Sequence, residues 1–342
     1  MIYLVTKQTN LQDDSYEIIS VEESLKILES LTIVGLDTET TGLNCHKDKL
    51  LSVQLGCKKF QVVIDCTTID IQEYKSYLES DRVFILWNAK FDLKWLYRYH
   101  IVPKNVYDGF LAEKIMWLGY PIVLTVDMWN NIKCDRYDYF PGDSKKDTEA
   151  HYKLQMNLKK AGEMYLGVEL DKSVRGKIIY LGLTPETIAY SANDVKYLED
   201  IKNCQEKLLK EKGLMLAMSY SNKFILALAY MEFCGVKVDI NKWIAKMNKD
   251  NEQLESYKKQ IDEWLIKNDP TSPYITINRQ GNLFEGFDLS PKVTVNWKSS
   301  QQVIPIFKKF GVNLEVLDKK TKKNKDSIDI KVLAPQKDKC SL

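Results

Sequence analysis

The feature that most constrains the fold is a short apolar run that ends in two acids. Residues 31–36, Leu-Thr-Ile-Val-Gly-Leu, have the composition of a strand, and Asp37 and Glu39 follow directly. Because side chains alternate along a strand, both carboxylates project from the same face. Two acids at the end of an apolar strand are costly to place unless a cation or hydrogen-bond donors compensate them. The pattern therefore indicates either a cation site at the end of a core strand or a strand end that water covers.

The residues that follow predict a mixed α/β domain. Short strands are expected at residues 50–55 and 60–65, and strands this close in sequence favour an antiparallel meander. A helical segment near residues 71–78, a buried strand over 83–87 and a helix from Phe91 come next. This succession is typical of a sheet covered by helices.

Two later segments complete the first part of the chain. The polar stretch 130–149 contains Pro141 and Gly142 and is predicted to be a surface loop or an insertion. A long helix is expected after it, with Thr184 as its N-cap, Pro185 at its first position and a stop at Gly213.

Length and charge divide the chain in two. Its 342 residues suit about two domains, on a prior of roughly 150 residues each. Residues 1–205 contain 25 Lys and Arg against 30 Asp and Glu, whereas residues 206–342 contain 24 against 17. We expect an acidic domain over 1–205 and a basic, mainly helical segment over 206–342, with helices at 224–233 and 243–267. Solvated lysines, such as those of a loop at 318–326, would give the same basic excess.

Composition disfavours several classes of protein. The N-terminus lacks the basic start and apolar stretch of a signal peptide, and the absence of a run of about 18 apolar residues excludes a membrane span. The seven cysteines form no Cys-x-x-Cys pair and the three histidines show no paired spacing, so a zinc site and a disulfide framework are disfavoured. We expect a cytoplasmic protein with no membrane partner.

Two further patterns carry candidate functional residues. Asn88 follows the strand expected at 83–87, and Asp92 lies one turn into the next helix, although the same positions suit a helix cap and a first-turn acid. Tyr190 and Asp194 lie four residues apart and therefore on one face of a helix, where a Tyr–Asp hydrogen bond at the surface is the alternative.

Taken together, four acids occur in order at element ends or on a core-facing helix: Asp37, Glu39, Asp92 and Asp194. Clustered carboxylates repel one another, and hard divalent cations relieve this repulsion because they prefer oxygen ligands. Such a site suits two Mg²⁺ or Mn²⁺ ions that act on a phosphodiester. Two other D-x-E triplets, at 147–149 and 250–252, fall in a polar loop and an amphipathic helix and lack this setting.

These motifs resemble the tyrosine-bearing branch of the DEDD superfamily of 3′–5′ exonucleases, which has a ribonuclease H-like fold. Asp37-Thr-Glu39-Thr-Thr-Gly-Leu43 is similar to the first motif, Asn88-Ala-Lys-Phe-Asp92 to the second and Tyr190-x-x-x-Asp194 to the third. The resemblance covers residues 1–205. It implies an α/β exonuclease domain with a mixed sheet.

The same resemblance implies roles for single residues. Asp37, Glu39 and Asp194 would hold one metal ion, with Asp37 also on a second, and Asp92 would hold water ligands of that second ion. Tyr190 would orient the attacking water. Substrate contacts are implied for the remaining motif residues: Leu43 on the terminal base, Asn88 on the terminal nucleotide or its phosphate, and Thr40 and Phe91 beside them.

The second part of the chain resembles the start of a polymerase. Residues 224–239 are similar to the helix and turn that open the polymerase domain of family A DNA polymerases, and residues 296–312 resemble their thumb. The helix at 224–233 would also pack as ordinary core. Residues 166–175 resemble the connection before the third motif in proofreading domains and ribonuclease D-like enzymes. A palm and fingers would lie beyond residue 342, so we expect a truncated polypeptide, the product of an interrupted gene or half of a split polymerase.

These observations predict a proofreading-type 3′–5′ exonuclease of a phage or bacterial replicative enzyme. It would release 5′-mononucleotides from the single-stranded 3′ end of DNA, while the basic thumb segment grips duplex DNA. Polymerase activity is not expected from this chain alone. Two alternatives remain open: a ribonuclease D-like exoribonuclease that prefers RNA, and a non-catalytic module that binds DNA or docks a separate palm-and-fingers fragment.

Overall fold

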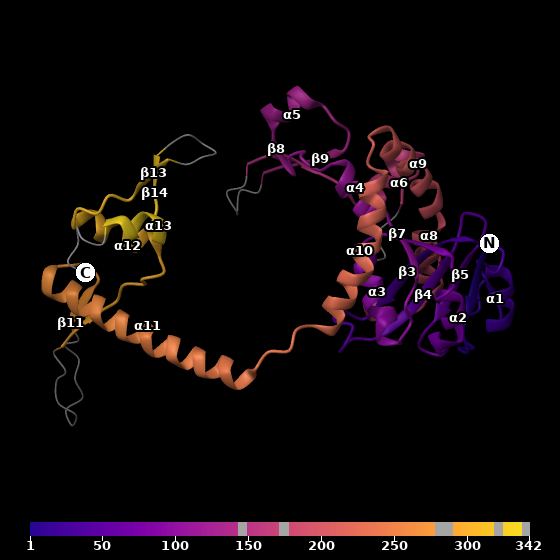
Figure 1. The fold of residues 1–342 in the computed structure, drawn as a ribbon, viewed down its shortest axis with the longest axis horizontal. Helices are drawn as coiled ribbons and strands as arrows, with labels where there is room; N and C mark the ends of the chain where they lie inside the picture. The colour runs from indigo at the N-terminus through magenta and orange to yellow at the C-terminus, as the bar shows by residue number, and fades with distance from the viewer. Residues whose placement is uncertain (143–148, 171–177, 278–289, 318–323, 337–342) are drawn as a thin grey trace. The chain divides into compact units, whose positions relative to one another are not determined.

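The chain forms two compact units, Met1–Val236 and Lys237–Leu342. The computed structural model describes residues 1–142, 149–170, 178–277, 290–317 and 324–336, which Figure 1 draws as a coloured ribbon. Residues 171–175 of the predicted connecting segment, Asp147, residues 318–323 of the lysine-rich loop and residues 337–342 lie outside this description.

A seven-stranded mixed sheet forms the centre of the first unit. Its strands in chain order are β1 (Ile2–Val5), β2 (Glu17–Ile18), β3 (Ile33–Thr40), β4 (Leu50–Gly56), β5 (Gln61–Asp65), β6 (Val83–Leu86) and β7 (Asn105–Asp108). Their order in the sheet is β2-β1-β5-β4-β3-β6-β7. β3, β4 and β5 pair antiparallel, which is the meander expected from the sequence, whereas β3 pairs parallel with β6 and β6 with β7. The mixed sheet predicted from the sequence is therefore confirmed.

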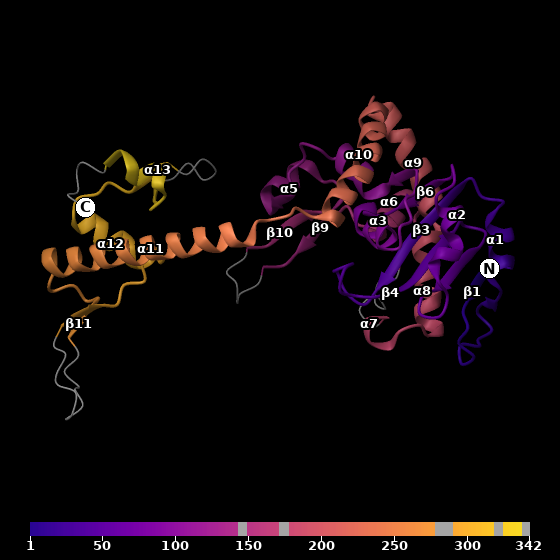
Figure 2. The ribbon, with the colours of Figure 1, turned by 60° about the horizontal axis from the view of Figure 1, so that its bottom comes forward.

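Helices cover both faces of this sheet. One face carries α1 (Val21–Leu28), α2 (Lys75–Leu78), α3 (Ala89–Arg98) and α10 (Met215–Cys234); the other carries α4 (Gly109–Met116), α6 (Leu158–Leu166), α8 (Pro185–Lys196) and α9 (Leu198–Glu211). The two-residue period of β6 serves both cores, because Phe84 and Leu86 pack on the first face and Ile85 on the second. Figure 2 shows α8 lying along the central strands, and it contacts β3, β4 and β5.

The single helix predicted from residue 185 to Gly213 is two helices, α8 and α9. Thr184 caps α8 as expected, since its side chain accepts a hydrogen bond from the Thr187 N–H, and Pro185 stands at the first position. At Tyr197 the backbone turns to φ −107° and ψ 1°, which ends α8. The apolar face continues across the break, with Val195, Leu198 and Ile201 in one core cluster. Because the helical spacing of apolar residues continues through Tyr197, the sequence did not predict the break.

The polar stretch around residues 130–149 belongs to an insertion with its own sheet, so a surface loop is not the whole description. Strands β8 (Val123–Thr125), β10 (His151–Leu154) and β9 (Tyr137–Phe140) pair antiparallel in that order, beside α5 (Val126–Ile132). A buried ion pair between Arg136 and Glu113 of α4 fastens the insertion to the body of the unit. Tyr165 of α6 joins this pair, accepting from Arg136 (2.9 Å) and donating to Glu113 (2.8 Å).

Helix α10 belongs to the first unit. Its Ala229 is fully buried in the core that α3 shares, and Asn222 Oδ1 accepts a hydrogen bond from the Asp108 N–H (3.1 Å). Lys90 of α3 forms an ion pair with Glu232 (2.7 Å). The sequence-based division after residue 205 falls within α9, whereas the compact unit extends to Val236.

The second unit is mainly helical in its described residues. The expected amphipathic helix is α11 (Ile240–Asn268), and its C-terminal end packs with α12 (Ser300–Lys309) around Leu265, Val303 and Ile306. Two short hairpins, β11 (Ile275–Ile277) with β12 (Pro291–Val293) and β13 (Glu315–Leu317) with β14 (Asn324–Asp326), complete it together with α13 (Ile330–Leu333). No helix in the described parts of the chain has the length and apolar character needed to span a bilayer.

Candidate active site

A close approach of α8 to β3 brings the first and third motifs together. Gly35 of β3 faces α8 so closely that a Cβ atom there would lie 2.6 Å from the carbonyl oxygen of Val195. Asp37 and Glu39 project from the same face of β3 as Gly35, and Asp194 directly precedes Val195. Ligand atoms of Asp37, Glu39 and Asp194 consequently lie within 4.8 Å of one another.

Asp92 reaches the site from α3, on the opposite face of the sheet. Thr38 alternates to that face and donates a hydrogen bond from Oγ1 to Asp92 Oδ1 (2.6 Å). Only 3% of Asp92 is exposed, and this burial raises the pKa of its carboxyl group to about 7, with Asp108 and Glu39 adding to the rise and the Thr38 hydrogen bond opposing it. Asp92 is not one of the three acids with mutually close ligand atoms.

Asn88 occupies the N-cap position of α3, but its side chain does not cap the helix. Its backbone is left-handed, with φ 72° and ψ 53°, a region that asparagine tolerates better than most residues. Asp108 caps in its place, accepting from the N–H groups of Asn88 and Ala89 (both 3.0 Å). The same carboxylate also accepts from the first N–H groups of α4, at Phe110 (3.0 Å). Asn88 therefore does not cap α3 with its side chain, and it lines the cleft described below.

One cleft of about 510 Å³ collects most of the predicted site residues. Its lining includes Asp37, Glu39, Leu43, Asn88, Phe91, Asp92 and Asp194. Leu43 stands at its edge with 85% of its surface exposed. Thr40 does not line the cleft, because it is buried and its hydroxyl donates to the Gly42 carbonyl (2.8 Å).

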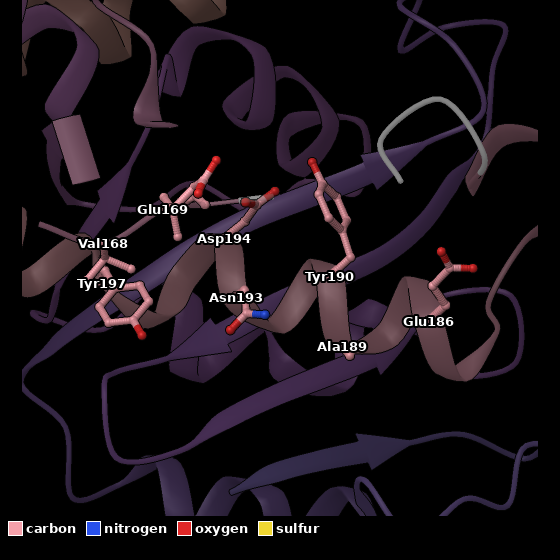
Figure 3. Close-up of a pocket in the computed structure, with 9 residues that line it drawn as sticks. Val168, Glu169, Glu186, Ala189, Tyr190, Asn193, Asp194 and Tyr197 are labelled. Carbon is pink, nitrogen blue, oxygen red and sulfur yellow. The ribbon is translucent and has the colours of Figure 1, made fainter. Parts of the chain in front are cut away.

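Tyr190 lies in a neighbouring pocket of about 410 Å³ that shares Asp194 with the cleft. Figure 3 shows the Tyr190 ring and the Asp194 carboxylate on the same side of α8, one turn apart, as the four-residue spacing predicted. Tyr190 is 6% exposed and therefore packed into the wall rather than free at the surface.

The donor set suits a hard divalent cation. Three carboxylates from two elements converge, all with oxygen as the donor atom, and a fourth lines the same cleft. Water alone compensates such a convergence poorly at a partly buried strand end. The acids thus form a preassembled oxygen cluster beside an open cleft.

Several residues of the site were not predicted from the sequence. Thr38 could have been identified, since it lies between Asp37 and Glu39 and strand alternation turns it to the opposite face of the sheet. Asp108 carried a weaker signal, as an acid at the end of a β-rich run followed by Gly109. No local pattern in the sequence marked Lys159, which lines the cleft from the first turn of α6.

More than half of the chain matches a known protein family. Residues 16–210 match the family described as 3′–5′ exonuclease, in the form attached to A-type DNA polymerases. The chain belongs to this exonuclease family. It is therefore a hydrolytic nuclease domain, and its motifs lie within the matched residues.

A curated relative of the exonuclease is DNA polymerase I of Aquifex aeolicus (strain VF5). The two are 27% identical over 277 residues, which are 74% of this chain and 40% of that polymerase. The chain thus spans about 40% of the length of the relative. At 74% of this chain, the aligned portion is longer than the first unit, Met1–Val236, and so it extends into the second unit.

The fold of the chain is similar to that of a solved nuclease structure. A nuclease determined in its apo form is 18% identical, with a TM-score of 0.50, covering 70% of this chain and 97% of its own. Escherichia coli RNase D, described as an exoribonuclease involved in structured RNA processing, is 19% identical with a TM-score of 0.47, covering 67% of this chain and 52% of its own. The likeness to the first describes the fold alone.

Proposed function

We propose that the cleft is a two-metal-ion site that removes nucleotides from the 3′ end of DNA. The convergence of Asp37, Glu39 and Asp194 within 4.8 Å carries this proposal. Asp37, Glu39 and Asp194 would hold one Mg²⁺ or Mn²⁺, with Asp37 shared by a second ion and Asp92 holding water molecules around it. When bound, such ions supply Lewis acidity that lowers the pKa of a water molecule and offsets charge on the phosphodiester.

The side chains around the acids would orient the strand and the water. Tyr190 would hold the attacking water through its hydroxyl group, since it lies one turn from Asp194 on the same side of α8. Leu43, exposed at the cleft edge, would press on the terminal base, and Phe91 would pack beside it. Asn88, whose side chain is not used as a cap, would contact the terminal nucleotide or its phosphate. Thr40 would act indirectly, by holding the turn that carries Leu43.

DNA is the favoured substrate because the chain is similar to a DNA polymerase over a stretch that exceeds the exonuclease match. We infer a proofreading part, residues 1–205, and a partial thumb within 206–342 whose basic charge would hold duplex DNA. A separate palm-and-fingers fragment would be a fitting partner. A bacterial or phage-infected cytoplasm is the expected location, since the cysteines among the described residues are free thiols.

A side-by-side digestion tests the substrate. Purified protein is given 5′-labelled single-stranded DNA and RNA of one sequence, with Mg²⁺ or with EDTA. We expect stepwise shortening of the DNA from its 3′ end with release of 5′-mononucleotides, slower cutting of RNA, and no cutting in EDTA. Faster cutting of RNA would favour the exoribonuclease alternative, and DNA binding without any cutting would favour a non-catalytic module.

A further inference from the structure

The cleft has one basic side chain, Lys159, among the residues that the structure describes. Four carboxylates line the same cleft. We propose that Lys159 binds a backbone phosphate of the substrate strand, and that Glu169 neutralises Lys159 until the strand arrives. The proposal rests on the proposed function, because its ligand is a nucleic-acid strand that lies in this cleft.

The position of Lys159 is fixed by the start of α6. Asn157 caps this helix, its Oδ1 accepting from the Lys160 N–H (2.8 Å), and residues 157–159 line the cleft. The first turn of a helix carries partial positive charge, which adds to that of the lysine. The neighbouring Lys160 points elsewhere, into ion pairs with Asp138 (2.9 Å) and Glu163 (3.6 Å), and is only 8% exposed. The two adjacent lysines therefore have different surroundings.

Lys159 forms an ion pair that a phosphate can displace. Its Nζ lies 3.5 Å from Glu169 Oε1, and the two side chains are 47% and 85% exposed. Ion pairs this exposed contribute little to stability, because water screens both charges. Glu169 also lines the pocket of Tyr190 and Asp194. Figure 3 shows its carboxylate on the same side of α8 as the side chains of these two residues. The pair thus joins a residue of the cleft to a residue of the neighbouring pocket.

The charge of the cleft explains why a lysine is needed there. Each linkage of the strand carries one negative charge, and the metal-binding acids can accommodate only the linkage that is cut. The next linkage would lie in the same cleft, where Lys159 is the one basic side chain among the described residues. Lysine suits it because an ammonium group is a compact charge with three donors and binds a phosphate from several directions.

Steady-state digestion of single-stranded DNA by the full chain tests the proposal. We expect Lys159→Gln to raise KM about tenfold while kcat changes much less, because a contact made to bound substrate and transition state alike acts on KM. The slope of log(1/KM) against log[salt] should become less steep by about 0.7, the value for one phosphate contact on a single strand. Lys159→Arg should restore most of both quantities.

Glu169→Gln should act in the opposite direction and lower KM two- to threefold, because it removes the competitor for Lys159. In the Lys159→Gln background the same change should leave KM unaltered. Lys153→Gln, on an exposed lysine of β10 that does not line the cleft, is the matched control and should leave KM and the salt slope as in the wild type.

The results separate this inference from the proposed function. If the wild type cuts DNA and Lys159→Gln matches Lys153→Gln in KM and salt slope, Lys159 does not bind phosphate and the inference is wrong. A fall in kcat at unchanged KM would overturn it as well. A wild type that cuts no DNA would refute the proposed function, and the inference with it.

Discussion

The protein opposes the charge of the Asp92 carboxylate. It is nearly inaccessible to water, its carboxyl pKa rises to about 7 through burial, and the Thr38 hydroxyl is the side-chain donor recorded for it. In the native metal-free protein it consequently keeps its proton at pH values at which the unfolded chain has lost it. Stability therefore falls as the pH rises between about 4 and 7 and levels off above.

Replacing Asp92 by asparagine should remove this pH dependence. Each unit of pKa difference corresponds to about 1.4 kcal/mol, so Asp92→Asn should raise the free energy of unfolding at pH 8 by roughly 2–4 kcal/mol and change it little at pH 4. Urea denaturation in EDTA at both pH values measures the difference. Asp81→Asn, at an exposed acid paired with Lys104, is the control and should be near neutral. An equal effect of Asp92→Asn at both pH values would contradict the buried-charge account.

Tyr190 should affect hydrolysis without affecting metal binding. Its ring is packed beside Asp194. In the proposed function its hydroxyl group orients the attacking water and does not bind a metal ion. Tyr190→Phe keeps the ring, so we expect single-turnover hydrolysis to slow by at least about tenfold while Mn²⁺ affinity stays within a factor of about two. An unchanged rate, or a parallel loss of Mn²⁺ affinity, would assign the hydroxyl a different role.

Sequence periodicity predicted the residues that share one element, and failed where elements meet. Asp37 with Glu39, and Tyr190 with Asp194, follow from the periods of a strand and a helix. The capping carboxylate of Asp108 was only weakly marked in the sequence, because its role arises from the approach of two helix starts that are 20 residues apart in sequence. For the same reason the sequence suggested Asn88 as the side-chain cap of α3, whereas the carboxylate that caps this helix belongs to the distant Asp108.

At the scale of elements, the distance between α8 and β3 determines whether the acids meet. The missing side chain at Gly35 allows this approach, because the obstacle there is the backbone of Val195 rather than a flexible side chain. We expect Gly35→Ala to displace α8, to lower the free energy of unfolding by about 1–3 kcal/mol and to weaken Mn²⁺ binding at least tenfold.

Two measurements on Gly35→Ala distinguish displacement from simple destabilisation. Urea denaturation gives the stability, and Mn²⁺ titration at a temperature where the variant is fully folded gives the affinity. A folded variant with wild-type Mn²⁺ affinity would mean that α8 tolerates the methyl group and that the close approach does not assemble the site.

The elements themselves were predicted unevenly. The meander, the helix after Asn88 and the cap of α8 follow from local composition, and the structure has them all. The break at Tyr197 was hidden by an apolar face that continues through it. The sheet of the insertion was hidden because its strands are only three or four residues long and the polar stretch with Pro141 and Gly142 separates β9 from β10.

At the scale of the whole molecule, α10 completes the first compact unit, which ends at Val236. Its buried residues complete the core on the α3 face, and Asn222 binds the backbone next to the Asp108 cap. A chain that ends at Val236 should keep the free energy of unfolding that the first unit has in the full chain. A chain ending at Gly213 should be less stable by about 3–5 kcal/mol, because several apolar side chains lose their cover.

Urea denaturation of the two shortened chains, with digestion of single-stranded DNA as the second readout, checks this boundary. Equal stability of the two would show that α10 is dispensable and would support a division near residue 205.

The converging acids should be required for hydrolysis, and the rate of mononucleotide release by Asp37→Asn tests this requirement most directly. The variant keeps the size of the side chain and removes one shared ligand charge. The variant and the wild type are compared across a range of Mg²⁺ concentrations. We expect the rate of mononucleotide release to fall at least about 1,000-fold, equivalent to about 4 kcal/mol in the activation free energy, with an unchanged melting temperature. Release at a rate near that of the wild type would contradict the account.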